Sequence, residues 1–197
     1  MSKKLSEMSL EELWQLFPIY LTEHNANWAA WYADEERYLK DHLPIDQIIR
    51  ISHIGSTSVK GIWAKPIIDI LVEVTPGSDI QQVKPIIEQA GYLCMSEDSR
   101  RISFNKGYTE NGFAERVFHL HLRKAGDNDE LYFRDYLNIH SNVAKKYEKL
   151  KLSLWKQYEH NRDGYTERKT AFVREQTQKA KVEFEKRYTY NASKNEP

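Results

Sequence analysis

A small-residue turn between two β-branched runs constrains this chain more than any other feature. Residues 47–54 alternate and are rich in isoleucine, which predicts a strand, and Gly55 and Ser56 then interrupt it. The backbone N–H groups of such a turn can receive a phosphate. The second run, residues 67–74, carries Asp69 inside it. Burying a carboxylate in a strand is costly unless it is paired, hydrogen-bonded or bound to a metal, so Asp69 needs a partner.

The length and charge of the chain narrow its class. Its 197 residues suffice for one well-buried domain and are few for two. Lysine plus arginine and aspartate plus glutamate number 29 each, so no overall positive field would gather nucleic acid or hold the chain on an anionic membrane. A single cysteine, Cys94, excludes an internal disulfide and fits a reducing compartment. No apolar run approaches the roughly 18 residues of a membrane span, so we expect a cytoplasmic protein.

Helix and strand signals follow one another in an order that predicts an α+β fold. A capping box at Ser9 opens a first short helix, and residues 27–43 form an amphipathic helix whose aromatic face should cover the sheet. A second capping box, at Ser78, predicts a helix ending near Gly91. Strands are expected at residues 47–54, 67–74, 92–95, 101–106 and 115–122. These elements give a mixed sheet of about five strands packed with helices.

The last third of the chain has a helical pattern. Helices are expected at residues 128–140, 141–160 and 166–188, with a turn at 161–164. Together they predict a C-terminal helical cap. We therefore expect a single domain over residues 1–197, divided into N-terminal helices and an α/β core at about 9–126, C-terminal helices at about 127–188 and a flexible tail at 189–197.

Two histidines follow the period of a strand. His119 and His121 alternate with Phe118 and Leu120, so a strand would place both imidazoles on one face. Rings about 7 Å apart along a strand can share a ligand, although exposed or hydrogen-bonded histidines fit the pattern as well. His53, just before the turn, is either a further member of this site or a histidine satisfied within its strand.

Motifs that occur in order along the chain resemble those of the GrpB family (UPF0157-like). The resemblance covers roughly residues 20–180. It rests on residues 54–59 (IGSTSV), 64–70 (AKPIIDI), 119–121 (HLH), 133–137 (FRDYL), 147–151 (YEKLK) and 169–173 (KTAFV). Members of this family look like nucleotidyltransferase-fold proteins, which implies a nucleotidyltransferase-like sheet in this chain. Fusions of GrpB-like domains to dephospho-coenzyme A kinase further imply a nucleotide- or coenzyme A-related ligand.

The wider superfamily places two carboxylates two residues apart on one strand after the glycine turn. Gly55, Ser56 and Asp69 match this pattern, but the second carboxylate position holds Leu71. Glu73 shares a face with Asp69, yet about 13 Å separates their Cα atoms along a strand, which is too far for two ions about 4 Å apart. The departure at Leu71 therefore argues against two-metal catalysis.

A single divalent metal fits the remaining side chains better. Asp69 with His119 or His121 would give mixed oxygen and nitrogen ligation, which accepts manganese, zinc or iron as well as magnesium. We expect these three residues to be both the metal ligands and the catalytic residues.

The turn and its neighbours are the expected phosphate site. Ser56 and Thr57 add hydroxyl groups to the backbone N–H groups that follow Gly55, and Pro66 keeps Lys65 extended. The alternative for this segment is a plain strand-to-helix turn with Ser56 as its N-cap.

Further basic residues are candidates for the same site. Arg134 lies beside Asp135 in a helical pattern, where it either forms a partly buried polar pair or reaches a ligand phosphate. Lys169 is a minor phosphate candidate, and residues 147–151 are interpreted mainly as helix packing. The basic residues after Cys94 either build a rim around Asp69 or remain solvated: Arg100, Arg101, Lys106, Arg116 and Arg123.

The leading hypothesis is an enzyme that transfers a nucleotidyl group, or handles another phosphorylated small molecule, with Asp69 holding a divalent cation such as magnesium, manganese or zinc. The alternative is a module that binds a nucleotide or a coenzyme A-type ligand without turnover, for which Leu71 is the main argument. A weaker alternative is a metal-dependent hydrolase built on Asp69, His119 and His121. The neutral charge balance gives no support to a nucleic-acid partner, and no oligomeric state is predicted.

Overall fold

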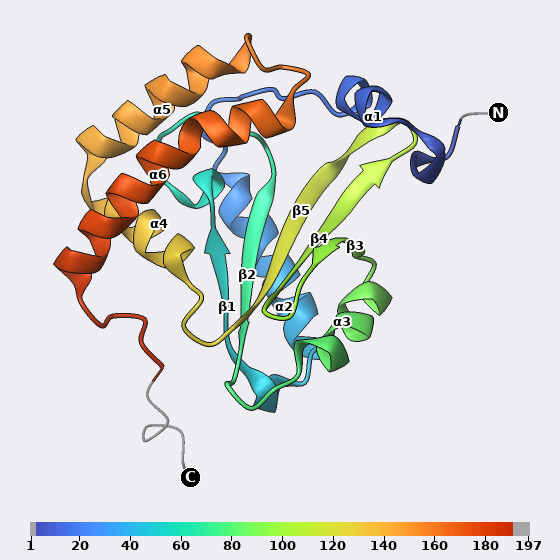
Figure 1. Ribbon diagram of the computed structural model, residues 1–197, viewed down its shortest axis with the longest axis vertical. Coiled ribbons are helices and arrows are strands. Elements are labelled where there is room, and N and C mark those ends of the chain that lie inside the picture. Colours follow the sequence, from blue (N-terminus) through green and yellow to red (C-terminus); the bar gives the residue numbers. More distant parts are fainter. Residues whose placement is uncertain (1–2, 191–197) are drawn as a thin grey trace.

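A five-stranded mixed sheet forms the centre of the computed structural model, which describes residues 3–190 (Figure 1). The strands are β1 (Ile48–Ile54), β2 (Ile68–Val74), β3 (Leu93–Glu97), β4 (Arg101–Thr109) and β5 (Gly112–Lys124), in the spatial order β1-β2-β5-β4-β3. β2 and β5 are parallel, whereas the other neighbouring pairs are antiparallel. The predicted α+β class and the five-stranded mixed sheet are confirmed.

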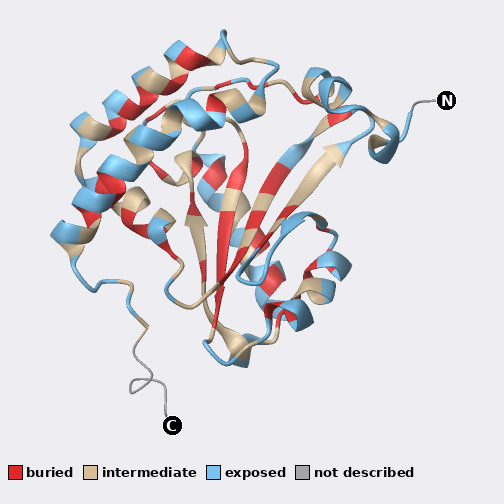
Figure 2. Ribbon diagram, in the orientation of Figure 1, coloured by how far each residue is buried: buried red, intermediate tan, exposed pale blue. Residues whose placement is uncertain are grey.

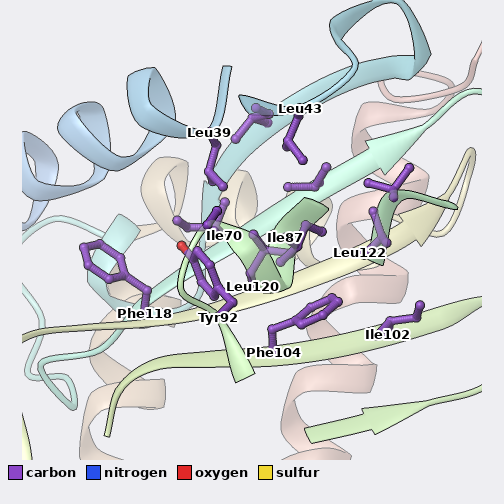
Figure 3. Close-up of a cluster of buried hydrophobic side chains, with 14 of the residues drawn as sticks. Leu39, Leu43, Ile70, Ile87, Tyr92, Ile102, Phe104, Phe118, Leu120 and Leu122 are labelled. Carbon is purple, nitrogen blue, oxygen red and sulfur yellow. The ribbon is translucent and has the colours of Figure 1, made fainter. Parts of the chain in front are cut away.

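One face of the sheet is covered by α2 (Asn27–His42) and α3 (Ile80–Gln89). Alternate residues of each strand point to this side. Ile70, Phe104 and Leu120, from three neighbouring strands, pack there with Leu39 of α2 and Ile87 of α3 (Figure 3). All five are completely buried, and burying a side chain of this size stabilises a fold by about 1.5–3 kcal/mol. This core fixes the strand register, and with it the positions of the residues on the opposite face.

The opposite face meets the helical cap. The cap consists of α4 (Asp129–Ile139), α5 (Ser141–Trp155) and α6 (Arg162–Phe184). Leu71 points to this side and packs against Ile54 and Leu131. Figure 2 shows buried residues along the central strands and on the inner sides of α5 and α6, whose outer sides are exposed. The predicted C-terminal helical cap is therefore confirmed.

The N-terminal elements are short. α1 (Leu10–Leu16) begins after Ser9, whose side chain accepts a hydrogen bond from the Glu12 N–H in the predicted capping box. Single 3₁₀ turns lie at Leu5–Glu7, Ile45–Gln47 and Ser56–Ser58.

Several helix boundaries differ from the sequence prediction, among them the end of α6 at Phe184, before the predicted position 188. α6 begins at Arg162 and not at 166, because the Asn161 side chain accepts a hydrogen bond from the Gly164 N–H and caps the helix. The predicted turn at 161–164 is thus the cap and first turn of α6. α5 ends at Trp155, before the predicted position 160. α3 is capped by Asp79, whereas Ser78 bonds to Thr75.

No helix within residues 3–190 is both long and apolar enough to cross a membrane. The predicted tail at 189–197 falls outside the described residues from position 191 onward.

Candidate functional site

A cavity of about 610 Å³ separates the sheet face that carries Asp69 from the helical cap. Six of the residues predicted for the site line it: Gly55, Ser56, Lys65, Asp69, His119 and His121. Helices α5 and α6 add Tyr147, Lys151, Tyr165 and Lys169. The sheet and the cap therefore build this cavity together.

The parallel pairing of β2 with β5 brings Asp69 beside the two histidines. Asp69 and His119 are register partners. Asp69 Oδ1 lies 3.2 Å from His119 Nδ1 and 3.6 Å from His121 Nε2. The centroids of the two imidazole rings are 6.5 Å apart. The prediction that both rings share the face of Asp69 is confirmed.

The outer nitrogens of both rings have partners of their own. His119 Nε2 lies 2.8 Å from the Tyr108 hydroxyl, and His121 Nδ1 lies 3.3 Å from Arg123 Nη2. A guanidinium can only donate, so His121 Nδ1 accepts and Nε2 carries the proton that faces Asp69. Burial lowers the pKa of His119, which keeps this ring neutral. Burial alone would raise the pKa of Asp69, but its contacts with His119 and His121 hold it well below the usual range.

These partners bear on the predicted metal site. Within residues 3–190 no group of three or more His, Cys, Asp and Glu side chains is arranged to hold a metal ion. A histidine nitrogen that donates a proton to Asp69 has no lone pair for a metal, and Arg123 opposes the other tautomer of His121. As placed, Asp69, His119 and His121 form a cluster of close polar contacts that does not fit a metal. Metal binding by them stays a prediction.

The backbone of Gly55 packs directly against the carboxylate of Asp69. Its φ of 70° and ψ of −172° belong to a region that is essentially restricted to glycine. A Cβ atom at this position would lie 2.1 Å from Asp69 Oδ2. Gly55, and not Ser56, is the N-cap of the 3₁₀ turn at Ser56–Ser58, so the alternative with Ser56 as N-cap is wrong.

Thr57 and His53 lie behind the turn and outside the cavity lining. The Thr57 hydroxyl donates to the Ile67 carbonyl at 3.1 Å and lies 2.9 Å from His53 Nε2. The His53 ring stacks on Tyr32 with centroids 4.8 Å apart, and burial lowers the pKa of His53 to about 4. Thr57 thus connects the turn to the residue before β2. His53 is a histidine satisfied within its strand, which was the alternative to its being a member of the site.

Three lysines gather at the cap end of the cavity. Lys65 Nζ and Lys169 Nζ lie 5.6 Å and 4.3 Å from the centroid of the same Tyr165 ring. Lys151 donates to the Trp63 carbonyl and lies 5.0 Å from the Tyr147 ring centroid. Among the described residues, none of these three ammonium groups forms an ion pair with a carboxylate.

The surroundings of these three lysines disfavour their protonated, charged forms. Burial, reinforced by Lys169 and Arg162, lowers the pKa of Lys65 to about 7. Burial and the neighbouring Lys169 lower the pKa of Lys151 to about 7 as well. Burial lowers the pKa of Lys169 to about 8, against the opposite pull of Asp69. Asp69 and Glu148 act on these lysines without forming an ion pair with them, and an anionic ligand would supply the paired charge.

Lys151 was missed by sequence reasoning, although the sequence holds a signal for it. Tyr147, Lys151 and Leu154 are spaced i, i+4 and i+7 on α5, and all three are buried. Lysine is rarely buried on the apolar face of a helix, and here its side chain lines the cavity.

The remaining predicted basic residues are engaged in the fold. Arg134 donates to Asp135 at 2.8 Å, to the His53 carbonyl at 2.9 Å and to the Tyr188 hydroxyl at 3.0 Å, and it does not line the cavity. Arg134 therefore forms the partly buried polar pair that was one of its two predicted roles, and its bond to the His53 carbonyl joins α4 to β1.

The predicted basic rim is largely neutralised. Arg101 bonds Asp127 at 2.6 Å, and the other paired members are Lys106 with Glu35, Arg116 with Asp34 and Arg123 with Asp127. Of the five predicted rim residues, Arg101 lines the cavity. Positive charge at the site therefore comes mainly from the lysines and not from the strands after Cys94.

Glu73 is occupied at the far end of β2. It pairs with Arg50 at 2.9 Å and accepts hydrogen bonds from Gly126 N at 2.6 Å and Asn128 Nδ2 at 3.0 Å. Its exclusion as a second carboxylate for Asp69 agrees with this placement.

Comparison with known proteins identifies the family. The family model described as GrpB protein matches residues 18–179. The glutamate-rich protein GrpB of Alkalihalophilus pseudofirmus is 35% identical over 163 residues, which cover 80% of this chain and 92% of that protein. The UPF0157 protein YqkA of Bacillus subtilis is 31% identical over 184 residues, and this chain spans about half (52%) of its length. The crystal structure of the conserved protein GrpB from Enterococcus faecalis aligns with a TM-score of 0.71 at 30% identity, over 84% of this chain and 99% of that one. The chain belongs to the GrpB family.

Proposed function

We propose that the cavity binds a phosphorylated small molecule, either a nucleotide or a coenzyme A-type ligand, with its phosphate at Lys65, Lys151 and Lys169. The observation that carries the proposal is the cluster itself: three buried or half-buried lysines face one cavity without a carboxylate partner among the described residues. Maintaining such a cluster costs free energy in the ligand-free protein, and a polyanion removes that cost. Lysine binds phosphate as a point charge, so no bidentate geometry is required.

The turn at Gly55 supports the same ligand from the sheet side. Gly55 and Ser56 both line the cavity, and the Ser58 N–H bonds the Gly55 carbonyl within the turn. Asp69 approaches this turn closely, so a phosphate placed there would need positive charge next to the carboxylate. The lysine cluster supplies such charge in the lining of the same cavity.

The reaction class that this site favours is nucleotidyl or phosphoryl transfer, in which lysines stabilise the charge on the phosphoryl oxygens. Magnesium, manganese or zinc at Asp69 would supply further positive charge, but His119 or His121 would first have to give up its contact with the carboxylate. Binding without turnover is the second candidate. It is favoured by Leu71, which is fully buried between Ile54 and Leu131 where the second carboxylate of the superfamily would lie.

Calorimetry with ATP, CTP and coenzyme A, each with and without manganese, tests the proposal. At least one ligand is expected to bind, and Lys151→Met is expected to weaken it, whereas Lys149→Met on the exposed side of the same helix should not. Failure of all three ligands to bind would contradict the proposal.

Consumption of the nucleotide separates transfer from binding alone. If manganese binding is lost in Asp69→Asn but not in His119→Ala, the metal is held without that histidine.

Ligand affinity is expected to fall with rising pH, by about tenfold or more between pH 7 and pH 9. The lysine pKa values of about 7, 7 and 8 mean that the amines lose their protons across this range. The ligand phosphate stays ionised over the same range, since its second pKa is about 6. Isothermal titration at constant ionic strength measures the change.

The same pKa values predict the opposite trend for the ligand-free protein. Unfolded lysine titrates near pH 10.4, so between pH 7 and pH 10 the unfolded chain binds more protons than the folded one. The contribution of these lysines to the free energy of unfolding therefore rises with pH. For the bound state, a ligand affinity that does not change with pH would show that these lysines do not contact the phosphate.

A further inference from the structure

We propose that Tyr108 and Arg162 are positioning residues for the Asp69 site, because together they fix the tautomer of His119. The hydrogen bonds themselves are independent of any ligand, while their effect on binding rests on the proposed function. Neither residue was predicted from the sequence, and neither lines the cavity.

Four side chains from four different elements form one chain of two hydrogen bonds and one ion-pair contact. Arg162, the first residue of α6, donates from Nη2 to the Tyr108 hydroxyl of β4 at 2.7 Å. The Tyr108 hydroxyl lies 2.8 Å from His119 Nε2 on β5, and His119 Nδ1 lies 3.2 Å from Asp69 Oδ1 on β2. The chain thus connects the helical cap to the carboxylate through the edge of the cavity.

The two ends of this chain set the direction of every hydrogen bond. The ionised Asp69 carboxylate can only accept, so His119 Nδ1 carries a proton. The Tyr108 hydroxyl carries one proton, and His119 Nε2, 2.8 Å away, is the acceptor that it faces. The Tyr108 oxygen in turn accepts from Arg162, which can only donate. One arrangement of protons satisfies all four groups, and it places His119 in the Nδ1–H tautomer.

Packing holds the middle of the chain in place. The Tyr108 ring contacts Phe17 and Phe113 with centroids 4.7 Å and 5.2 Å apart, and it stacks nearly parallel to His119 at 6.0 Å. The Arg162 guanidinium carbon lies 5.4 Å from the centroid of the same Tyr108 ring. The tyrosine therefore cannot turn away from His119 without disrupting an aromatic cluster.

The two carboxylate oxygens of Asp69 have different contacts in this arrangement. Its Oδ1 receives both histidines, and its Oδ2 is the atom that approaches Gly55 at the proposed phosphate turn. α6 also carries Lys169, so the helix that contributes a phosphate-binding lysine is the helix that begins with Arg162. Docking of α6 consequently sets both the lysine cluster and the orientation of Asp69.

Nitrogen-15 NMR of the histidine rings in the ligand-free protein tests the proposal. We expect the wild-type His119 signal to be that of the Nδ1–H tautomer, assigned by its absence in His119→Gln. In Tyr108→Phe, loss of the hydroxyl donor should reduce the predominance of this tautomer about tenfold. Arg162→Met should have a smaller effect in the same direction, and Arg162→Lys should restore the wild-type ratio. Tyr38→Phe, at an exposed tyrosine, is the matched control.

The proposal is overturned if wild-type His119 is protonated on Nε2, or if Tyr108→Phe leaves the tautomer ratio unchanged. Should Tyr108→Phe fail to fold, the pair Arg162→Met and Arg162→Lys decides the matter by the same ratio. ATP titration of the folded variants gives a separate readout, with an affinity loss of about threefold to tenfold expected in Tyr108→Phe. A protein that shows the tautomer change but binds no phosphorylated ligand contradicts the proposed function and not the positioning role.

Discussion

Replacing Lys151 with methionine is expected to stabilise the ligand-free protein and to weaken phosphate binding at least about tenfold. Lys151 is 2% exposed, and burial lowers its pKa to about 7 from the ordinary 10.5. Methionine keeps the length and removes the desolvated amine, at the loss of the hydrogen bond to the Trp63 carbonyl. The net gain in the free energy of unfolding should be about 1–3 kcal/mol at pH 7. Chemical denaturation and titration with ATP or coenzyme A measure the two effects.

Opposite signs for stability and binding are the signature of a functional residue at this position. Lys149→Met, on the exposed side of α5, should change the free energy of unfolding by less than about 0.5 kcal/mol and leave the affinity alone. A loss of stability in Lys151→Met with unchanged binding would instead make Lys151 a structural residue that holds the Trp63 segment.

Replacing Gly55 with alanine is expected to have the largest effect on the fold and to abolish ligand binding. The backbone at Gly55 lies in a region that costs other residues about 1–3 kcal/mol, and the added methyl would meet Asp69 Oδ2 at 2.1 Å. Relieving that clash must move either the turn or the carboxylate. We expect a total loss of about 3 kcal/mol or more in the free energy of unfolding.

Gly61→Ala is the matched control for this substitution. Gly61 also has a positive φ, of 72°, but a Cβ atom there would meet nothing within 4 Å. The two variants thus share a positive φ and differ in the contact with Asp69. Combining Gly55→Ala with Asp69→Ala should recover part of the lost stability, because it removes Oδ2 and Cγ, at 2.1 Å and 2.8 Å from the added methyl, although the Cβ at 2.9 Å remains. Equal effects of Gly55→Ala and Gly61→Ala would show that backbone conformation alone requires glycine at position 55.

The convergence of Asp69, His119 and His121 could be predicted from the sequence because it depends on simple periods. The alternation of His119 and His121 with apolar neighbours fixes their common face, and a β-branched run fixes Asp69 in a neighbouring strand. The strand positions followed from the same patterns to within a few residues, except that β4 and β5 extend further into their shared hairpin.

The cap's contribution to the site could not be predicted in the same way. Lys151 and Tyr108 acquire their roles from contacts between elements far apart in the chain, which no local pattern encodes. Gly164 indicated a turn, but the Asn161 cap extends α6 across it, and this extension places Arg162 within reach of Tyr108. Thr57 was expected at a ligand because a hydroxyl group suits phosphate, whereas it bonds the backbone before β2. For Arg134 the sequence allowed a ligand contact or a polar pair, and only the structure shows the pair and the docking of α4.

The single parallel strand pair also has a consequence for how the protein folds. β4 and β5 are joined by a short hairpin, but Asp69 and His119, paired between β2 and β5, are 50 residues apart in the chain. Closing a segment of this length requires a larger entropy loss than closing a hairpin, so this pairing is expected to form late. During refolding, hairpin structure should therefore appear before the protein can bind a ligand, and the candidate site should be the last part of the molecule to be assembled.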